Sequence, residues 1–259
     1  MFQKNILSEL IKISYDAGVL IMNIYNSKFE INHKNDNSPV TNADRDAEEF
    51  ILKKLNNIFP NIPIISEEAY SNNIIPSYDK KFFLIDPLDG TKEFIKKNGE
   101  FTVNIAFIDE GFTKIGFINA PAKNKIFFND EKKSYVIETK SKDQISIQKA
   151  KQIKVSNEKQ KNLIATISRS HAEKETENLL KNYDIDKINY LGSSYKFCSI
   201  ASGEAHIYPR MSPTCEWDTA AGHAILKTAG GNTRLLNGEE LRYGFKENNF
   251  INPYFIARN

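Results

Sequence analysis

Several features that mark particular classes of protein are scarce in this sequence of 259 residues. Its two cysteines, Cys198 and Cys215, are too few for a disulfide framework, so we expect a reduced, cytoplasmic chain. No run approaches the roughly 20 apolar residues that cross a bilayer. Charged residues interrupt the apolar residues near the N-terminus, which is unlike a signal peptide. Disulfide-stapled and membrane-spanning classes are therefore not expected.

The sequence also lacks an excess of charge of either sign. Lys and Arg number 35 against 33 Asp and Glu, which gives a formal net charge of +2. A dedicated nucleic-acid binder usually shows a clustered basic excess, so we expect no nucleic-acid partner. Hydrophobic residues at 40% and charged residues at 26% are ordinary for a globular protein. The length allows one large domain or two modest ones.

The first half of the chain changes its apolar period along its length. Helical spacing predicts an amphipathic helix over residues 5–26, whose apolar face could pack in a core or rest on the inner membrane surface. Residues 41–44 (TNAD) have the pattern of a capping box, so we expect a second helix from there to Pro60. The period then becomes two and the connections are short, which predicts an antiparallel sheet. Its expected strands are residues 62–66, 82–85, 102–108, 114–118, 125–128 and 135–138.

The second half reads as alternating strands and helices. A polar run over residues 140–160 suggests a boundary, so we expect an N-terminal α+β domain over residues 1–150 and a C-terminal α/β domain over residues 151–259. The expected elements of the latter are strands over 163–167, 187–191 and 205–208, and helices over 172–183, 195–202 and 218–228.

Residues 86–91 (DPLDGT) carry the strongest chemical signal. Asp86 and Asp89 flank a proline directly after a short apolar strand, and Gly90 permits a tight turn. The two carboxylates and the carbonyl of Leu88 can then converge as oxygen ligands of the kind that Mg²⁺ prefers. The alternative is an ordinary solvated turn.

Two further acidic groups could complete such a site. Glu67 and Glu68 follow the strand over residues 62–66, although acids there are often only exposed. Asp218 stands where a helix begins, so it could instead complement the helix dipole. The small residues 220–222 after it would let that helix approach a ligand closely, whereas His223 is expected to be structural. Acids without Cys or His partners favour Mg²⁺ over Zn²⁺.

These strings together resemble the inositol monophosphatase-like family of Mg²⁺-dependent, lithium-sensitive phosphatases. That family pairs a D-P-[IL]-D-G-T string with an upstream E-E and a distal W-D, and all three occur here in the same order. Longer strings resemble its nucleotidases that act on 3′(2′),5′-bisphosphates. They are residues 36–41 (DNSPVT), 86–95 (DPLDGTKEFI), 98–106 (NGEFTVNIA), 167–172 (ISRSHA), 192–198 (GSSYKFC) and 217–224 (WDTAAGHA). The resemblance covers essentially the whole chain and implies a layered α/β/α/β/α sandwich.

The resemblance also implies roles for the acidic residues. Two or three Mg²⁺ ions would be bound by Glu67, Asp86, Asp89, Asp218 and the Leu88 carbonyl, with Glu68 as a further contact. Asp44 would pair with Thr91, and the two would orient the attacking water, with Glu67 beside them. Asp44 could alternatively be only a helix cap. Gly90 and Thr91 would contact the phosphate being removed, next to Leu88, Asp89 and Asp218.

A bisphosphate has a second phosphate, which needs cations or donors away from the metals. The resemblance implies His171, Ser193 and Lys196 for the adenine and 5′-phosphate, and we add Arg169 and Arg210 as candidates. Arg169 and Lys196 could instead be exposed charges, and Ser193 a helix cap. Lys92 and Glu93 are expected to border the pocket without an assigned role.

The leading hypothesis is hydrolysis of adenosine 3′,5′-bisphosphate to AMP and phosphate, which would clear a by-product of sulfate activation. The same site could act on 3′-phosphoadenylyl sulfate. The alternative within the same chemistry is an inositol or sugar phosphatase, and one from another class is a non-catalytic phosphate or nucleotide sensor. Monomer and homodimer are both open.

Overall fold

Helical periodicity near the N-terminus produces a pair of long helices. The computed structural model describes residues 3–34, 37–140, 145–157, 161–170 and 174–259. Helix α1 (Lys4–Tyr25) and helix α2 (Asn42–Ile58) follow the predicted spans closely. The capping box at the start of α2 is confirmed, since Thr41 Oγ1 accepts from the Ala43 N–H at 3.1 Å and Asp44 Oδ2 accepts from the Thr41 N–H at 2.8 Å.

The apolar stripe of α1 is buried against α2 and a sheet. Packing therefore accounts for its amphipathic pattern, and the option of a membrane-resting helix gains no support. Among the described residues, no helix is both long and apolar enough to span a bilayer.

The larger sheet has seven strands in the order β3-β4-β5-β6-β7-β8-β9. All neighbours are antiparallel, as predicted, except β3 and β4, which run parallel. Strand β9 follows the expected boundary at residue 150 yet pairs with β8, so this sheet extends beyond that boundary. The strands are β3 (Ile64–Ser66), β4 (Lys81–Asp89), β5 (Thr102–Asp109), β6 (Phe112–Ala120), β7 (Lys125–Asn129), β8 (Ser134–Glu138) and β9 (Lys151–Ile153).

The smaller sheet has five strands in the order β11-β10-β12-β14-β13. Strands β10, β11 and β12 are parallel and were expected from the sequence, whereas β13 and β14 were not. These strands are β10 (Leu163–Ser168), β11 (Ile185–Leu191), β12 (Ile207–Arg210), β13 (Asn232–Leu235) and β14 (Phe255–Arg258). Shorter elements are β1 (Ile31–His33), β2 (Pro39–Thr41), α3 (Glu67–Ser71), α4 (Thr91–Ile95) and the 3₁₀ turns η1 (Pro121–Lys123), η3 (Ile147–Lys149) and η4 (Lys246–Asn248).

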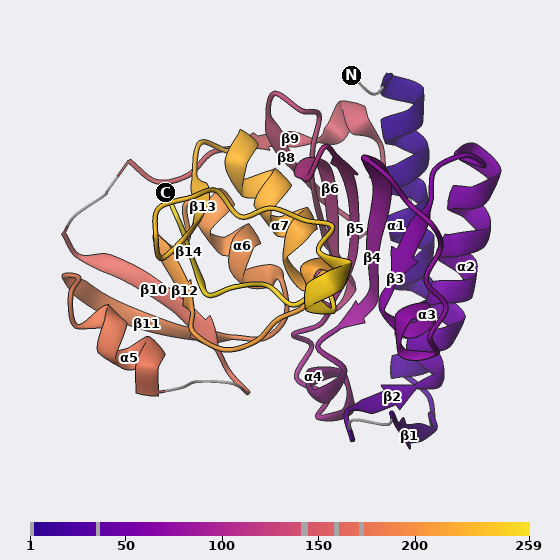
Figure 1. The fold of residues 1–259 in the computed structure, drawn as a ribbon, viewed down its shortest axis with the longest axis horizontal. Helices are drawn as coiled ribbons and strands as arrows, with labels where there is room; N and C mark the ends of the chain where they lie inside the picture. The colour runs from indigo at the N-terminus through magenta and orange to yellow at the C-terminus, as the bar shows by residue number, and fades with distance from the viewer. Residues whose placement is uncertain (1–2, 35–36, 141–144, 158–160, 171–173) are drawn as a thin grey trace.

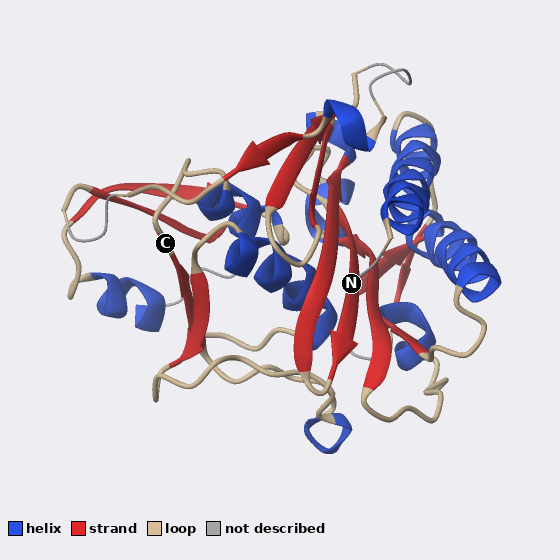
Figure 2. Cartoon of the chain, turned by 90° about the horizontal axis from the view of Figure 1, so that it is seen from above, coloured by secondary structure: helices blue, strands red, loops and turns tan. Residues whose placement is uncertain are grey.

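Helices and sheets stack in five layers (Figure 1). Helices α1 and α2 cover one face of the larger sheet, and α6 (Tyr195–Ala201) and α7 (Glu216–Thr228) lie between the two sheets. Helix α5 (Lys174–Leu180) covers the far side of the smaller sheet and ends before the predicted residue 183, whereas residues 172 and 173 of the predicted helix lie outside the described residues. The view from above shows the same separation of the outer helix pair from the inner helices (Figure 2). The predicted α/β/α/β/α sandwich is confirmed.

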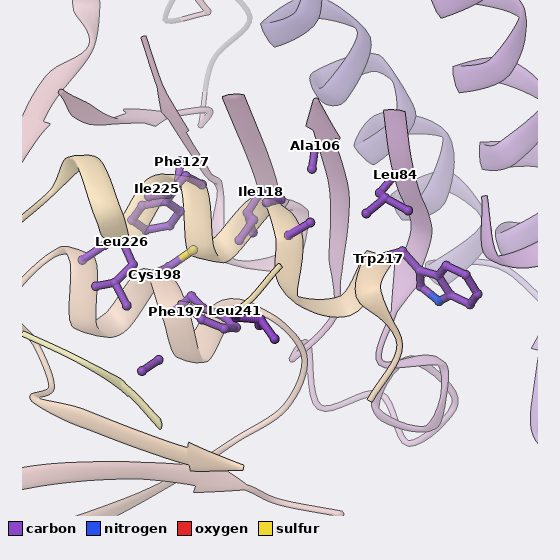
Figure 3. Close-up of a cluster of buried hydrophobic side chains, with 14 of the residues drawn as sticks. Leu84, Ala106, Ile118, Phe127, Phe197, Cys198, Trp217, Ile225, Leu226 and Leu241 are labelled. Carbon is purple, nitrogen blue, oxygen red and sulfur yellow. The ribbon is translucent and has the colours of Figure 1, made fainter. Parts of the chain in front are cut away.

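The small residues of α7 allow close packing inside the core, and their role in close approach to a ligand stays a prediction. A Cβ on Gly222 would lie 2.4 Å from the ring of Phe197 on α6, and one on Gly116 of β6 would lie 2.3 Å from the Ala221 carbonyl. Figure 3 shows the resulting cluster, in which α6 and α7 side chains meet the larger sheet. His223 is structural, as predicted: it is buried, its Nδ1 lies 3.0 Å from the Tyr243 hydroxyl, and burial lowers its pKa to about 4.

Candidate active site

Acidic side chains gather where two parallel strands end. Ser66 of β3 pairs with Ile85 of β4, so the carboxyl ends of both strands meet at one edge of the sheet. Glu67 and Glu68 follow β3, and the 86–91 turn ends β4. The first turn of α7 brings Asp218 to the same place, since Asp218 lines one cavity together with Glu67 and Asp89. The structure therefore gathers the carboxylates predicted from three separate stretches of sequence.

The crowding of these carboxylates makes their ionisation costly. Burial, followed by the charges of acidic neighbours, raises the pKa of Asp86 well above its ordinary value and that of Asp218 to about 8. Burial likewise raises the pKa of Asp89 to about 6, although Lys196 opposes the shift. For Glu68, burial and then Glu67 raise the pKa to about 7. Such a group of carboxylates is poised to accept a cation.

One cation that sequence analysis missed already lies among these acids. The Lys34 ammonium is 2.6 Å from Oε1 of both Glu67 and Glu68. Burial opposes its charge, but the two carboxylates outweigh burial and raise the pKa of Lys34. No signal in the polar stretch around residue 34 distinguishes this lysine from a solvated one.

The residues present fit a hard divalent cation. The converging donors are carboxylate oxygens together with the backbone carbonyl of Leu88, which is the donor set typical of Mg²⁺. Within the described residues, no three acidic, Cys or His side chains are already in a metal-binding arrangement.

Asp44 and Thr91 pair as predicted. Thr91 Oγ1 donates to Asp44 Oδ1 at 2.9 Å, and the same hydroxyl lies 3.3 Å from the Leu88 carbonyl. Asp44 Oδ2 receives the N–H and the hydroxyl of Thr41, so Asp44 also caps α2. Burial raises the pKa of Asp44, while its hydrogen bonds from Thr41 and Thr91 oppose the shift.

A cavity of about 360 Å³ joins the acidic cluster to a cationic side. Its lining includes Glu67, Asp89, Thr91 and Asp218 together with Ser193, Lys196 and Arg210. Burial, with a smaller contribution from Arg210, lowers the pKa of Lys196 to about 8 despite the opposing charge of Asp89. The Lys196 ammonium donates to the Ser193 carbonyl at 2.5 Å. Lys92 and Glu93 border the cavity, as expected.

Two of the residues predicted for the second phosphate are not placed in this cavity. Arg169 is absent from its described lining, because its guanidinium forms two 2.8 Å hydrogen bonds to the Glu100 carboxylate. The prediction that Arg169 contacts the second phosphate therefore gains no support from this cavity. His171 lies outside the described residues.

Asn104 and Glu48 are polar residues that support the site and were not identified from sequence. Asn104 Nδ2 donates to Asp89 Oδ2 at 3.3 Å, and the Ser194 N–H donates to the same oxygen at 2.5 Å. Glu48 Oε1 accepts the N–H groups of Glu68 and Ala69, each at 3.1 Å, which fixes the start of α3. The signal for Asn104 was a polar residue inside the otherwise apolar strand over residues 103–108.

Known proteins resemble this chain over nearly its whole length. A model of the "Inositol monophosphatase family" matches residues 3–255. The chain is 42% identical over 260 residues to the "3′(2′),5′-bisphosphate nucleotidase CysQ" of Buchnera aphidicola, covering 98% of this chain and 94% of that protein. It is 39% identical over 251 residues to the protein of the same name from Escherichia coli K12, covering 96% and 98%. The crystal structure of CysQ from Bacteroides thetaiotaomicron matches with a TM-score of 0.80 at 36% identity, covering 99% and 97%.

Proposed function

The chain belongs to the inositol monophosphatase family, and from that membership we propose that it is a 3′(2′),5′-bisphosphate nucleotidase. It hydrolyses the 3′-phosphate of adenosine 3′,5′-bisphosphate to give AMP and phosphate, which clears a by-product of sulfate activation. The observation that supports this substrate is the cavity itself. Acidic and cationic side chains line this one cavity: the acidic group is suited to the metal and the phosphate being removed, and Lys196 and Arg210 are suited to a second phosphate.

The proposed cofactor is Mg²⁺, as two or three ions. The side chains of Glu67, Asp86, Asp89 and Asp218 and the carbonyl of Leu88 would hold it, with Glu68 as a further contact. When bound, Mg²⁺ neutralises charge on the phosphoryl group and lowers the pKa of water. Phosphate-monoester hydrolysis is extremely slow without catalysis, so this contribution is needed.

The proposed roles of the protein groups follow from their hydrogen bonds. Thr91 Oγ1 donates a hydrogen bond to Asp44 Oδ1, which leaves a lone pair of the Thr91 oxygen for the attacking water. The Thr91 oxygen can then accept a proton from that water. Backbone groups around Gly90 and Thr91 hold the phosphate. Water adds to phosphorus and passes a proton towards Thr91 and Asp44. The bond to the 3′-oxygen breaks, and that oxygen takes up a proton from solvent water to become the 3′-hydroxyl of AMP.

The cationic side supports selectivity for a nucleotide carrying two phosphates. Arg210 donates to the carbonyls of Ser212 and Pro213, at 3.2 and 3.0 Å, and no carboxylate of the described residues pairs with it. Ser193 and Lys196 lie beside it in the cavity lining, and His171 is proposed as a further contact. A second candidate function, inositol phosphate hydrolysis, uses the same acidic cluster. An inositol monophosphate has no second phosphate for Lys196 and Arg210 to bind.

We further propose that the chain works in the cytoplasm on this small molecule, because both cysteines are free thiols. Monomer and homodimer both remain compatible with this proposal. Activity on 3′-phosphoadenylyl sulfate uses the same contacts, since that nucleotide carries the same 3′-phosphate.

Phosphate release from adenosine 3′,5′-bisphosphate and inositol 1-phosphate, each with Mg²⁺ and with EDTA, tests this function. We expect Mg²⁺-dependent release with a strong preference for the nucleotide. A preference for inositol 1-phosphate would keep the metal chemistry and overturn the nucleotide assignment. Release from neither would favour the sensor hypothesis.

A further inference from the structure

A short segment of the C-terminal half presses on the acidic cluster. In residues 191–196, the Ser194 N–H donates to Asp89 Oδ2 at 2.5 Å, and Ser194 Oγ donates to Asn104 Oδ1 at 2.7 Å. Lys196 projects from the same segment into the cavity. The orientation of Asp89 and the position of Lys196 therefore depend on one stretch of backbone.

That stretch has a backbone conformation which its own sequence does not favour. Ser193 has a φ of +51°, in the left-handed region that non-glycine residues adopt only when the surroundings require it. The neighbouring Gly192 is closely packed: a Cβ there would lie 2.6 Å from the Glu100 carbonyl oxygen and 2.7 Å from Glu93 Cγ. Some neighbouring group must hold residues 192–193 in this place.

Glu100 supplies the contacts that do so. Its carboxylate accepts the Gly192 N–H at 2.9 Å and both Nε and Nη2 of Arg169, each at 2.8 Å. Arg169 in turn donates from Nη2 to the Tyr190 carbonyl at 2.5 Å, and its backbone N–H donates to the Leu191 carbonyl at 3.1 Å. The two side chains thus bind the backbone at Tyr190 and Gly192, immediately before Ser193.

The Glu100 carboxylate is well suited to this task. It is only 9% exposed, and it precedes β5, the strand that carries Asn104. Burial opposes its charge, but the hydrogen bonds from Arg169 and Gly192 outweigh burial and hold the pKa of Glu100 below its ordinary value. A bidentate arginine–carboxylate pair also fixes orientation, which a single lysine contact does not.

We propose that Glu100 and Arg169 form a positioning pair that holds residues 191–196 against Asp89, and that Arg169 makes no contact with substrate. This inference rests on the proposed function only in that the cavity is taken to be a phosphatase site. It replaces the expectation that Arg169 binds the second phosphate.

The test compares Glu100→Gln, Arg169→Ala, Arg169→Lys and the Glu100→Gln/Arg169→Ala double variant. Substrates are adenosine 3′,5′-bisphosphate and 3′-AMP, which lacks the second phosphate. Misplacement of a catalytic group by about 1 Å can lower the rate about 100-fold. We therefore expect Glu100→Gln and Arg169→Ala each to lower kcat about 10-fold or more on both substrates. The double variant is no worse than the more affected single, since the pair acts as a unit. Arg169→Lys restores part of kcat.

A readout independent of turnover accompanies the kinetics. The melting temperature is measured at increasing Mg²⁺ concentration, and the midpoint is the Mg²⁺ concentration that gives half of the total increase. We expect this midpoint to rise about 10-fold in the pair variants, because Asp89 loses its orientation. Matched controls are Glu110→Gln, from an exposed ion pair with Lys80, and Arg234→Ala, whose guanidinium bonds only an exposed turn carbonyl among the described residues. Both leave kcat and the Mg²⁺ midpoint unchanged.

Two outcomes overturn the proposal. If Arg169→Ala raises KM for the bisphosphate alone and leaves kcat on 3′-AMP intact, Arg169 is a phosphate contact. If the pair variants leave kcat and the Mg²⁺ midpoint at wild-type values, the pair is only structural. Failure of the proposed function is separate: it appears in the wild-type substrate preference, whereas this proposal is judged on ratios of variant to wild type and on Mg²⁺ binding.

Discussion

At the residue scale, single carboxylates serve two purposes because each has two oxygens. Asp44 uses Oδ2 to cap α2 and Oδ1 to hold Thr91. Asp218 uses Oδ2 to accept the Cys215 N–H at 2.8 Å, which leaves Oδ1 for the acidic cluster. The sequence offered capping and catalysis as alternatives at Asp44, and helix-dipole support and metal binding at Asp218. At Asp44 the two uses are compatible, and at Asp218 the geometry leaves room for both.

Replacing Asp89 by Asn is expected to separate function from stability. Loss of a group that hydrogen-bonds a metal ligand already lowers metal affinity or activity about 10- to 100-fold. Loss of a direct ligand should therefore lower kcat at least about 100-fold. The fold should survive, because Asn keeps an oxygen for the Ser194 N–H and removes one charge from a crowded cluster. Phosphate release and the melting temperature in EDTA measure the two effects. Normal turnover by this variant would exclude Asp89 from the metal site.

The raised pKa values of the cluster predict an unusual pH dependence of stability. In the metal-free protein, the pKa rises from 3.8 to about 8 for Asp218 and to about 6 for Asp89, and from 4.5 to about 7 for Glu68. The folded state therefore binds more protons than the unfolded chain between about pH 4 and pH 8, so these groups lower stability as pH rises through that window.

Mg²⁺ should reverse this trend, because it binds the ionised carboxylates. We expect the melting temperature in EDTA to fall between about pH 6.5 and pH 8, and the increase caused by Mg²⁺ to be larger at the higher pH. Burial lowers the pKa of His223 from 6.5 to about 4, so His223 opposes this trend below about pH 6.5. The lowered pKa values of Glu100 and Glu240 act mainly below this window. An Mg²⁺ effect that shrinks as pH rises would contradict the account.

At the element scale, the acidic residues of the candidate site lie at the ends of secondary-structure elements. These are the carboxyl ends of β3 and β4 and the first turn of α7. These ends were predictable because each acidic motif directly follows or opens a periodic apolar segment. Strands β13 and β14 were missed since each has only four residues and lies in a loop-rich stretch. Lys34 and Glu100 were also missed. Their roles depend on partners far away in sequence, Glu67 and Glu68 for the first and Arg169 for the second.

The packing of α7 against α6 supplies a test at this scale. Gly222→Ala would place a Cβ 2.4 Å from the ring of fully buried Phe197. Overpacking of this kind costs about 1–3 kcal/mol, so we expect a lower melting temperature. Asn56→Ala, at an exposed position of α2, is the control and should change stability little. An unchanged melting temperature of Gly222→Ala would show that α6 and α7 leave room for a methyl group at residue 222.

At the scale of the whole molecule, the active cavity draws on both halves of the chain. Residues up to 150 supply Glu67, Asp89 and Thr91, and residues beyond 150 supply Lys196 and Asp218. The layered architecture and the acidic cluster could be predicted, because long strings of sequence resemble a family. The placement of Arg169 could not, because an exposed phosphate-binding arginine and one paired with a distant glutamate look alike in sequence.

The central claim is that one cavity recognises two phosphates, one at the acidic cluster and one at Lys196. The most direct measurement is kcat/KM for adenosine 3′,5′-bisphosphate and for 3′-AMP, in the wild type and in Lys196→Ala. Hydrogen bonds to charged groups contribute about 1.5–3 kcal/mol, so the wild type should prefer the bisphosphate by about 10-fold or more. Lys196→Ala should lose most of that preference through a raised KM for the bisphosphate, while exposed Lys53→Ala keeps it. Equal loss on both substrates, or an undiminished preference in Lys196→Ala, would contradict the account.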